Sequence, residues 1–496
     1  MIWWKLAVVV VAWRVFNSLS LATFFQADEF YQALEIAHER VFGYGYVTWE
    51  WPEHLRSTLH PSIYSLGYSF LQAFSADSRS AVILVPKFIN AAIAAISELM
   101  LYKWLGNYDP SVATITTLLS LANPFNWYVS TRSFANQFEQ MLTMCAMAWW
   151  PWSTTNTKGK KRRPSHLKTA LVFACLSCIV RPTNVLYWIP FGLGLLVRSH
   201  TKAKLVVVTV IVAAATLAAS AVIDRQFYDT WTLPMINFLR FNVVNNLSVF
   251  YGTAPWHFYI GQALPMMLMT YIPLFLLGLA KSARTSAEMV AAMVLVVLGF
   301  SAIEHKEVRF LLPIQPLLMY FCGTGVLSVM RSRWFKPVMA LVITANVAVG
   351  YFLARVNERG AIAIVDYLAD VHSFAILAPC HSTPWQSHLH NPQLNGWFLT
   401  CKPPLNVPLE GYMDESDVFY ADPEKWLETN MAPNWSQLSL GSRRAWPTHL
   451  VMFQALVPDL ESYLDNSPYR ECHREWNSYF HWDGRRHGDL VVFCRQ

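Results

Sequence analysis

Two adjacent carboxylates, Asp28 and Glu29, follow the first apolar stretch of the chain and could carry out proton transfer. A carboxylate at a membrane–water boundary is costly unless it faces water, where it can take a proton from an attacking hydroxyl group. The alternative is structural, because an acid placed just before Phe30–Arg40 could cap a helix that starts there. Asp28 is the first choice for the base, since its side chain has fewer rotamers than that of Glu29.

Cationic groups gather far downstream, in the segment His305-Lys-Glu-Val-Arg-Phe310 between two apolar runs. An arginine fork combined with lysine and histidine is suited to binding a phosphate, so His305, Lys306 and Arg309 are candidate phosphate ligands. The alternative is a short loop of interfacial charges that keeps a helical hairpin from slipping.

Arg181 is a further candidate, because Arg181-Pro-Thr183 interrupts an apolar stretch, 167–198, that is too long for one membrane span. Proline breaks the helical hydrogen-bond ladder, and an arginine at mid-membrane is costly. Two shorter helices that meet at Arg181 explain both facts. Broken helices in membranes often mark binding sites, and their termini can meet an anion.

Aromatic and amide side chains with the character of a sugar site occur in two segments, 43–61 and 224–260. The weaker candidates for acceptor or sugar binding are Trp49, Glu50, Trp51, His60, Trp256 and His257. An aromatic belt at the membrane interface has the same composition without any ligand. The chain has no Gly-rich phosphate loop, no Gly-x-Ser-x-Gly elbow and no metal-binding His pair, which favours a lipid-borne donor over a nucleotide sugar.

The composition is that of an integral membrane protein. Of the 496 residues, 54% are hydrophobic and only 14% are charged, against roughly a quarter in soluble proteins. Much of the net charge of +6 lies in Lys158–Arg163. Because this cluster lies between apolar runs, we interpret it as a cytosolic loop and not as a nucleic-acid site. The N-terminal apolar run lacks a small-x-small cleavage site and is predicted to be a retained span.

The apolar runs predict 11 spans. They are expected at 2–25, 82–104, 110–129, 134–152, two within 167–198, 204–223, 256–280, 287–303, 308–330 and 337–356. The ambiguous segment 61–77 is interpreted as an interfacial helix, because a span there would place Lys158–Arg163 outside. The N-terminus is then cytosolic. The opposite, lumenal side carries Asp28, Arg181, His305–Arg309 and the C-terminal tail that begins at residue 357.

Glycosylation signals and cysteines agree with this orientation. The sequons at Asn246 and Asn434 both fall on the predicted lumenal side. Four cysteines, Cys380, Cys401, Cys472 and Cys494, lie in the tail, where an oxidising compartment would allow up to two disulfides in any of three connectivities. None has the spacing of a zinc site, and no metal is predicted.

The chain is therefore expected to have two parts. Residues 1–356 form a transmembrane catalytic region whose first lumenal loop, 26–80, carries interfacial helices. Residues 357–496 form a small lumenal α/β domain, with strands predicted at 375–378 and 489–493 and a helix at 422–429.

These motifs resemble a known family. Asp-Glu-Phe-Tyr-Gln (28–32), Phe-Gly-Tyr-Gly-Tyr-Val-Thr-Trp-Glu-Trp (42–51), Arg-Pro-Thr (181–183) and His-Lys-Glu-Val-Arg-Phe (305–310) are similar to those of the dolichol-phosphate-mannose-dependent glycosyltransferases of family 22, which have the multi-span GT-C fold. The resemblance runs over roughly residues 1–356. The stretch 224–257 resembles the members that extend the GPI anchor, and residues 381–388 resemble their fungal forms. Many members have proline before the acidic pair, where this chain has Ala27.

The resemblance implies transfer of mannose from dolichyl phosphate mannose to a GPI-precursor glycolipid in the ER lumen, namely the third mannose, in α1,2 linkage. It implies that Asp28 is the base and that Arg181 and the 305–309 motif hold the donor phosphate. The β-linked donor and α-linked product imply a single inverting displacement, for which no cofactor is required. Protein partners are not predicted.

Three other functions agree with the same sequence. A sister enzyme could act on the N-glycan lipid precursor or add the fourth GPI mannose. A lipid-sugar transporter or scramblase would also use broken helices and cavity charges, but it leaves the acidic pair unexplained. A binding subunit built around the tail is the third.

Overall fold

The computed structural model describes residues 3–152, 166–405, 407–435 and 443–496. The predicted cytosolic loop Lys158–Arg163 lies outside the described residues. The chain divides into two compact units. Unit 1 consists of 1–20, 50–64 and 86–351, and unit 2 of 21–49, 65–85 and 352–496.

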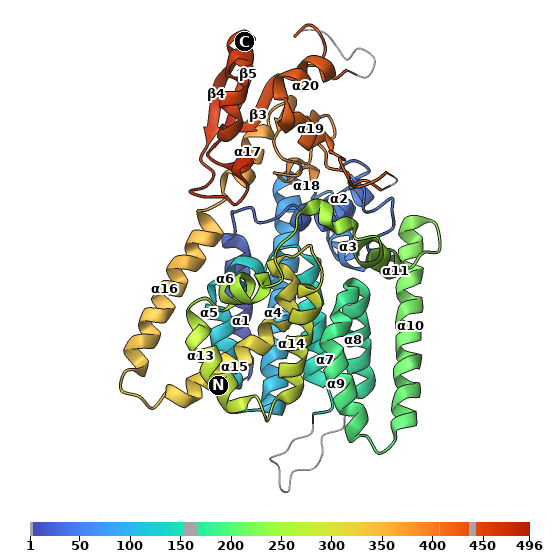
Figure 1. The fold of residues 1–496 in the computed structure, drawn as a ribbon, viewed down its shortest axis with the longest axis vertical. Coiled ribbons are helices and arrows are strands. Elements are labelled where there is room, and N and C mark those ends of the chain that lie inside the picture. Colours follow the sequence, from blue (N-terminus) through green and yellow to red (C-terminus); the bar gives the residue numbers. More distant parts are fainter. Residues whose placement is uncertain (1–2, 153–165, 406, 436–442) are drawn as a thin grey trace. The chain divides into compact units, whose positions relative to one another are not determined.

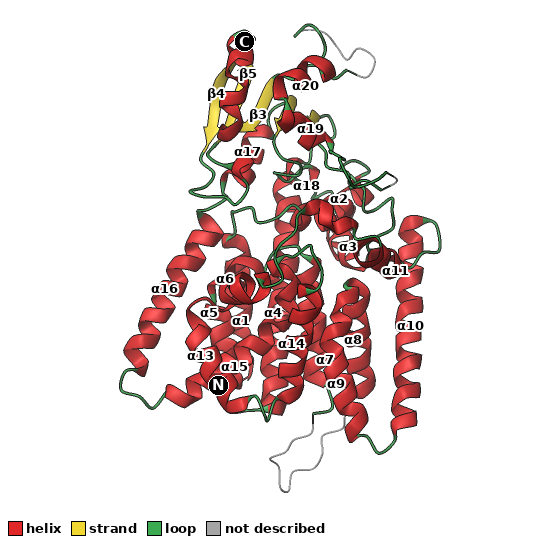
Figure 2. Ribbon diagram, in the orientation of Figure 1, coloured by secondary structure: helices red, strands yellow, loops and turns green. Residues whose placement is uncertain are grey.

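Unit 1 is helical (Figures 1 and 2). Its α-helices are α1 (Trp3–Ser20), α5 (Ala113–Ala122), α6 (Pro124–Val129), α7 (Ala135–Trp149), α8 (Leu167–Val180), α9 (Val185–Arg198), α10 (Lys202–Tyr228), α11 (Pro234–Leu239), α12 (Leu264–Leu268), α13 (Ile272–Ser282), α14 (Ala287–Ser301) and α15 (Gln315–Val329). Short 3₁₀ or π turns join several of them: η2 (Pro182–Asn184), η3 (Arg240–Val244), η4 (Leu247–Tyr251), η5 (Tyr259–Ala263), η6 (Met269–Tyr271) and η7 (Val308–Ile314). Helix α7 packs against α8, α9 against α14, and α13 against α15.

Three helices contribute residues to both units. They are α3 (Leu59–Ala73), α4 (Arg79–Tyr108) and α16 (Phe335–Arg355). Helix α3 covers most of the segment predicted to be an interfacial helix.

Among the described residues, five helical segments are long and apolar enough to cross a membrane. They are Arg79–Tyr108, Lys202–Tyr228, Tyr259–Ser282, Val308–Val329 and Phe335–Leu368. The other predicted spans coincide with shorter helices. The predicted break within 167–198 is present: α8 ends at Val180 and α9 begins at Val185.

Two of the predicted spans are not single helices. The span predicted at 110–129 is interrupted at Asn123, whose side chain caps α6 by accepting a hydrogen bond from the Asn126 N–H at 2.8 Å. The span predicted at 256–280 is interrupted at Met269, where φ is +51°. The Asn123 amide donates to the Met267 carbonyl just before that break, at 3.0 Å. The first break carries the same kind of sequence signal as Pro182, because Pro124 follows Asn123 at the start of α6, whereas Met269 carries none.

Unit 2 contains all five strands of the described chain, shown in yellow in Figure 2. They are β1 (Ser373–Leu377), β2 (Asn395–Phe398), β3 (His449–Phe453), β4 (Tyr469–Glu475) and β5 (Leu490–Arg495). The sheet order is β2-β1-β3-β5-β4. Strand β1 is parallel to β2 and β3, while β5 is antiparallel to β3 and β4. The two predicted strands coincide with β1 and β5.

Helices surround this sheet. They are η1 (Phe30–Leu34), α2 (Glu35–Phe42), α17 (Gly360–Leu368), α18 (Gln386–Leu389), α19 (Glu415–Ala421), α20 (Pro423–Asn430), η8 (Gln454–Leu460), α21 (Glu461–Asp465) and η9 (Gly484–Arg486). The predicted helix at 422–429 coincides with α20.

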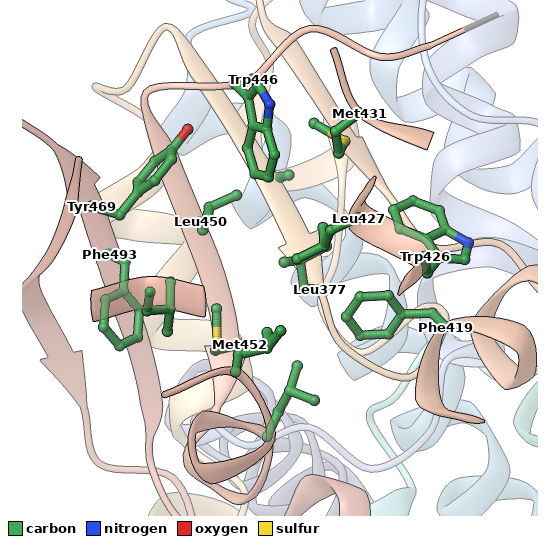
Figure 3. Packing of buried hydrophobic residues seen from close by; sticks show 14 of the residues in the cluster. Leu377, Phe419, Trp426, Leu427, Met431, Trp446, Leu450, Met452, Tyr469 and Phe493 are labelled. Carbon is green, nitrogen blue, oxygen red and sulfur yellow. The ribbon is translucent and has the colours of Figure 1, made fainter. Parts of the chain in front are cut away.

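The core of unit 2 lies on one face of the sheet (Figure 3). Alternate residues of each strand, such as Leu450 and Met452 of β3, point to this face because side chains alternate along a strand. They pack against Phe419 of α19 and Trp426 of α20. On the opposite face, the Tyr367 ring of α17 stacks on His473, with centroids 4.0 Å apart. Burial of each large apolar side chain contributes about 1.5–3 kcal/mol.

Candidate active site

Arg181 is held at the break between α8 and α9. Proline at 182 disfavours helical backbone in the preceding residue, and Arg181 accordingly has φ −140° and ψ 104°. The Asn184 side chain fixes the turn by donating to the Glu139 carboxylate at 2.7 Å and accepting from Ser177 at 3.0 Å. The break thus places one guanidinium group inside unit 1 on a rigid turn.

The Arg181 side chain is only 3% exposed, yet its Nε has no hydrogen-bond partner among the described residues. Glu139 lies near enough to interact with it electrostatically, as do Arg56 and Arg309. A buried cation without a hydrogen-bonded counterion is costly. The position of Arg181 therefore fits an anionic ligand.

Three arginines form a row separated by two phenyl rings. The Phe238 ring lies 5.7 Å from the Arg56 guanidinium and 5.5 Å from that of Arg181. The Phe310 ring lies 5.4 Å from Arg181 and 5.7 Å from Arg309. Guanidinium groups at such distances gain cation–π energy from the ring faces. Both rings therefore help to hold three like charges close together.

The two outer arginines of this row have carboxylate partners. Arg56 donates to Glu50 at 2.8 Å. Arg309 donates from both Nε and Nη2 to the Glu307 carboxylate, the second bond being 2.9 Å long. A phosphate would therefore gain most electrostatic energy at the middle arginine, Arg181.

Glu307 is shared between Arg309 and His305. The Nε2 atom of His305 lies 3.0 Å from Glu307 Oε1, and its Nδ1 lies 2.8 Å from the Gly252 carbonyl. Burial would raise the pKa of Glu307, but the neighbouring Arg309 and His305 hold that pKa well below its usual range. Burial lowers the pKa of His305, but its bond to Glu307 outweighs this and raises it overall. The protonated imidazole can donate from both nitrogens.

Lys306 differs from the arginines. Its ammonium group donates to the backbone carbonyls of Ala254, at 2.8 Å, of Glu304, at 3.4 Å, and of Ile303. The bond to Ala254 therefore holds the 303–306 turn against the 252–254 loop, and the other two bonds stabilise the turn itself. The structure gives Lys306 this structural role, and its part in phosphate binding stays a prediction.

The acidic pair lies in unit 2. Asp28 and Glu29 form the first turn of a helical segment that continues through η1 and α2. Negative charge is favoured in the first turn of a helix. The position therefore agrees with the alternative that the acid stabilises the start of the helix, and it leaves the role of Asp28 as base open. Glu29 is 7% exposed, whereas Asp28 is half-buried. Asp28 is thus the more accessible of the two carboxylates.

Asp28 interacts electrostatically with His381 of the tail. Tyr31, one turn beyond Asp28, stacks on the His381 ring with centroids 4.0 Å apart and donates to the Thr383 carbonyl at 3.0 Å. Burial lowers the pKa of His381 to about 4, against the opposing effect of Asp28, so the imidazole is neutral near pH 7. His381 is not among the site residues predicted from the sequence.

The predicted sugar-binding residues do not form one cluster within either unit. In unit 1, Trp51 is buried against Tyr228, and His60 is buried beside Tyr64 and Phe138. In the same unit, Glu50 pairs with Arg56, while Trp256 and His257 are exposed on the surface. Trp49, in unit 2, lines a hollow together with His381.

Both predicted glycosylation asparagines, Asn246 and Asn434, are exposed. The third residue of the second sequon, Ser436, lies outside the described residues. The four tail cysteines form two disulfides, Cys380–Cys401 and Cys472–Cys494. Of the three connectivities open from the sequence, this is the one in which cysteines near in sequence pair.

Arg56 and Phe238 are the candidate site residues that sequence reasoning missed. Arg56 lies in the segment 43–61, and Phe238 lies in the segment 224–260. Both segments are rich in polar and aromatic residues. The convergence of the two residues on Arg181 depends on contacts between distant segments.

The comparison with protein families gives one match over most of the chain. Residues 4–390 match the model of the Alg9-like mannosyltransferase family. The chain belongs to the Alg9-like mannosyltransferase family.

Relatives within this family match nearly the whole chain. GPI mannosyltransferase 3 of Candida albicans is 45% identical, over 99% of this chain and 98% of its own length. GPI alpha-1,2-mannosyltransferase 3 of Mus musculus is 33% identical, over 98% of this chain and 88% of its own.

Solved structures share the fold at low sequence identity. ArnT from Cupriavidus metallidurans bound to undecaprenyl phosphate has a TM-score of 0.56 at 12% identity, covering 100% of this chain and 98% of its own. The oligosaccharyltransferase of Archaeoglobus fulgidus has a TM-score of 0.51 at 11% identity, covering 98% and 76%. These neighbours support the GT-C-type fold expected from the sequence.

Proposed function

We propose that this chain adds the third mannose of a GPI precursor, in α1,2 linkage, with dolichyl phosphate mannose as the donor. The observation that carries the proposal is the near-full-length similarity to relatives named GPI mannosyltransferase 3, at 45% identity in Candida albicans. The mouse relative, which is named an alpha-1,2-mannosyltransferase, supports the linkage.

Asp28 serves as the general base in this proposal. Its carboxylate takes the proton from the 2-hydroxyl group of the second mannose as that oxygen attacks the anomeric carbon of the donor. Its partial exposure supports this role over Glu29, which is almost fully buried. A single displacement converts the β-linked donor into an α-linked product.

The donor phosphate binds at Arg181 in unit 1. The bond from the anomeric carbon to the phosphate oxygen breaks, and dolichyl phosphate leaves with the electron pair. Guanidinium groups positioned before the reaction stabilise the charge that develops there. The support for this assignment is the buried Arg181 Nε without a partner, in a row with Arg56 and Arg309.

No redox cofactor enters this reaction, because one glycosidic bond forms as one phosphoester bond breaks and a single proton moves to the base. A metal is not demanded, since the Arg181 guanidinium can supply positive charge at the leaving group.

We place the protein in the ER membrane with a cytosolic N-terminus and with Asp28, Arg181 and the tail on the lumenal side. The two disulfides of unit 2 support an oxidising compartment. The exposure of Asn246 and Asn434 permits their glycosylation, which requires lumenal access. Cleavage of the Lys158–Arg163 loop by protease only after the lumen is opened would contradict this orientation.

The decisive experiment is an assay of the purified full-length protein. It uses radiolabelled dolichyl phosphate mannose with a two-mannose GPI acceptor, and we expect a three-mannose product whose label an α1,2-specific mannosidase releases. Transfer only to a three-mannose GPI or to the N-glycan lipid precursor would identify a sister enzyme. Movement of the donor across vesicle bilayers without formation of a glycosidic bond would identify a transporter.

A further inference from the structure

A hollow of about 240 Å³ lies in unit 2. Its walls include Tyr46 and Trp49 from the first loop, His381 from the segment after β1, and Thr400, Cys401 and Lys402 from the segment after β2. Since a cavity needs only roughly 10–15 Å³ of such space to hold one water, the hollow has room for a ligand much larger than a water molecule. This room is sufficient for a single sugar ring.

The hollow lies beyond the carboxyl ends of two neighbouring strands, β1 and β2. Strands β1 and β2 are parallel neighbours, with Ile376 paired to Phe398 at their carboxyl ends. In open α/β sheets, ligands usually bind where the strand order reverses, which in this sheet is between β1 and β3, so the hollow between the β1 and β2 ends is one strand gap away from that crevice. The Cys380–Cys401 disulfide joins the two segments that leave these ends, so the walls of the hollow are fixed covalently.

The chemistry of the walls fits a carbohydrate. Tyr46 and Trp49 offer aromatic faces, and the exposed Lys402 offers an ammonium donor. The His381 Nε2 atom is buried without a hydrogen-bond partner among the described residues. An apolar face beside a few convergent polar groups is typical of sites that bind small polar ligands.

The hollow and the proposed base belong to the same unit. His381 lines the hollow, interacts electrostatically with Asp28, and stacks on Tyr31 in the helical segment that Asp28 begins. An acceptor whose reacting hydroxyl group reaches Asp28 can therefore place an adjoining sugar beyond His381.

We propose that the hollow binds a mannose of the acceptor glycan next to the mannose that reacts. This inference rests on the proposed function and deepens it, because it assigns acceptor recognition to the parallel-strand edge of the tail domain together with the first loop.

The test separates the two substrates kinetically. Trp49→Ala and Lys402→Ala should each raise the KM for the two-mannose acceptor while the KM for dolichyl phosphate mannose stays within twofold of wild type. For Trp49→Ala we expect about a five- to tenfold increase, the range of a lost aromatic contact. Trp482→Ala and Lys425→Ala, which remove exposed side chains of the same types elsewhere in unit 2, are the matched controls and should change neither KM.

An unchanged acceptor KM in both hollow variants, or equal changes for donor and acceptor, would overturn the proposal. Saturation-transfer NMR with the methyl glycoside of a mannose disaccharide tests binding without turnover. The signal should appear with wild type and the Trp482→Ala control and should be lost with Trp49→Ala; equal signals with all three would also overturn it. Absence of mannosyl transfer by the wild type would instead count against the proposed function, whatever the NMR result.

Discussion

Arg309 donates two hydrogen bonds to the Glu307 carboxylate, one from Nε and one from Nη2, and these bonds fix the plane of the guanidinium group. The same carboxylate lies 3.0 Å from His305. Glu307 therefore orients two cations of the motif at once. It is also the counterion that keeps Arg309 in a row with Arg181, across the Phe310 ring.

Arg309→Lys should raise the KM for dolichyl phosphate mannose about ten- to a hundredfold, the equivalent of losing one charged hydrogen bond, and leave the acceptor KM nearly unchanged. Lysine offers a point charge and cannot bond both oxygens of Glu307 in the fixed geometry of the arginine fork. Glu307→Gln should also raise the KM for dolichyl phosphate mannose. In the Arg309→Lys/Glu307→Gln double variant, the increase should be smaller than the two single effects combined, because both residues take part in one interaction. Steady-state kinetics with each substrate varied would check this; equal changes in both KM values would indicate a packing role instead.

Arg181→Met should lose donor affinity without losing stability. The wild-type guanidinium is buried and its Nε is unpaired, so an apolar side chain of similar length removes a desolvation cost. We expect an unchanged or higher melting temperature together with a donor KM raised at least about tenfold, the loss of one charged hydrogen bond.

The matched control for that variant is Arg14→Met. Arg14 is also buried, but it donates to Asn17 at 2.9 Å and to Ser130 at 2.7 Å and forms an ion pair with Glu98. Its loss leaves the Glu98 charge buried and unpaired, at a cost of about 3–5 kcal/mol. Thermal unfolding, monitored as the loss of folded protein in size-exclusion chromatography, should therefore show a lower melting temperature for Arg14→Met only. Equal destabilisation by both substitutions would contradict a ligand-binding role for Arg181.

Asp28→Asn should abolish transfer while leaving the protein folded, because the substitution keeps the shape of the side chain and removes the base. The expected loss is about 10²–10⁴-fold in kcat. Glu29→Gln should retain most of the activity, since the Glu29 side chain is almost fully buried. Single-turnover assays at saturating donor and acceptor measure the chemical step, and the opposite ranking of the two variants would assign the base to Glu29.

Glu35 should make the stability of the protein pH-dependent. Its carboxyl group is fully buried, and burial raises its pKa from 4.5 to about 7, although the Trp385 and Ser387 backbone N–H groups both donate to it. An acid whose pKa is raised in the folded state contributes stability below its unfolded pKa and loses it as pH rises through the folded pKa. Stability should thus fall by on the order of 3 kcal/mol between pH 4.5 and 7. In Glu35→Gln that decrease should be absent, and melting temperatures of both proteins across this range would check it.

The parts of the fold that follow from local sequence could be predicted. Pro182 ends α8 by its own backbone chemistry, so the break at Arg181 is visible in the sequence. The break at Met269 is not, because methionine has no such restriction and the turn is stabilised by amides from elsewhere in the chain. The strands β1 and β5 are visible as short apolar runs, but their order in the sheet is not.

The candidate site also contains residues that the sequence reveals and residues that it does not. Asp28, Arg181 and Arg309 stand out because charges are rare beside apolar runs. Arg56 does not stand out, since it lies in a polar segment, and its relation to Arg181 through the shared Phe238 ring appears only in the fold. The disulfides likewise depended on strand pairing: in the antiparallel ladder of β4 and β5, Arg470 and Cys494 are partners, which brings Cys472 within reach.

The carbonyl of Met267 has a consequence for how the protein is made. It accepts hydrogen bonds from Asn123 at 3.0 Å and from Gln315 at 3.4 Å, residues that enter the chain about 140 positions earlier and about 50 later. In hydrocarbon, a backbone carbonyl released by a helix break must find a donor or cost several kcal/mol. Asn123 precedes this segment in the chain and can supply that donor, so the break at Met269 should form as soon as Tyr259–Ser282 packs against the start of α6. The later bond from Gln315 then adds to a contact that already exists, so this part of unit 1 should assemble in the order in which its helices are synthesised.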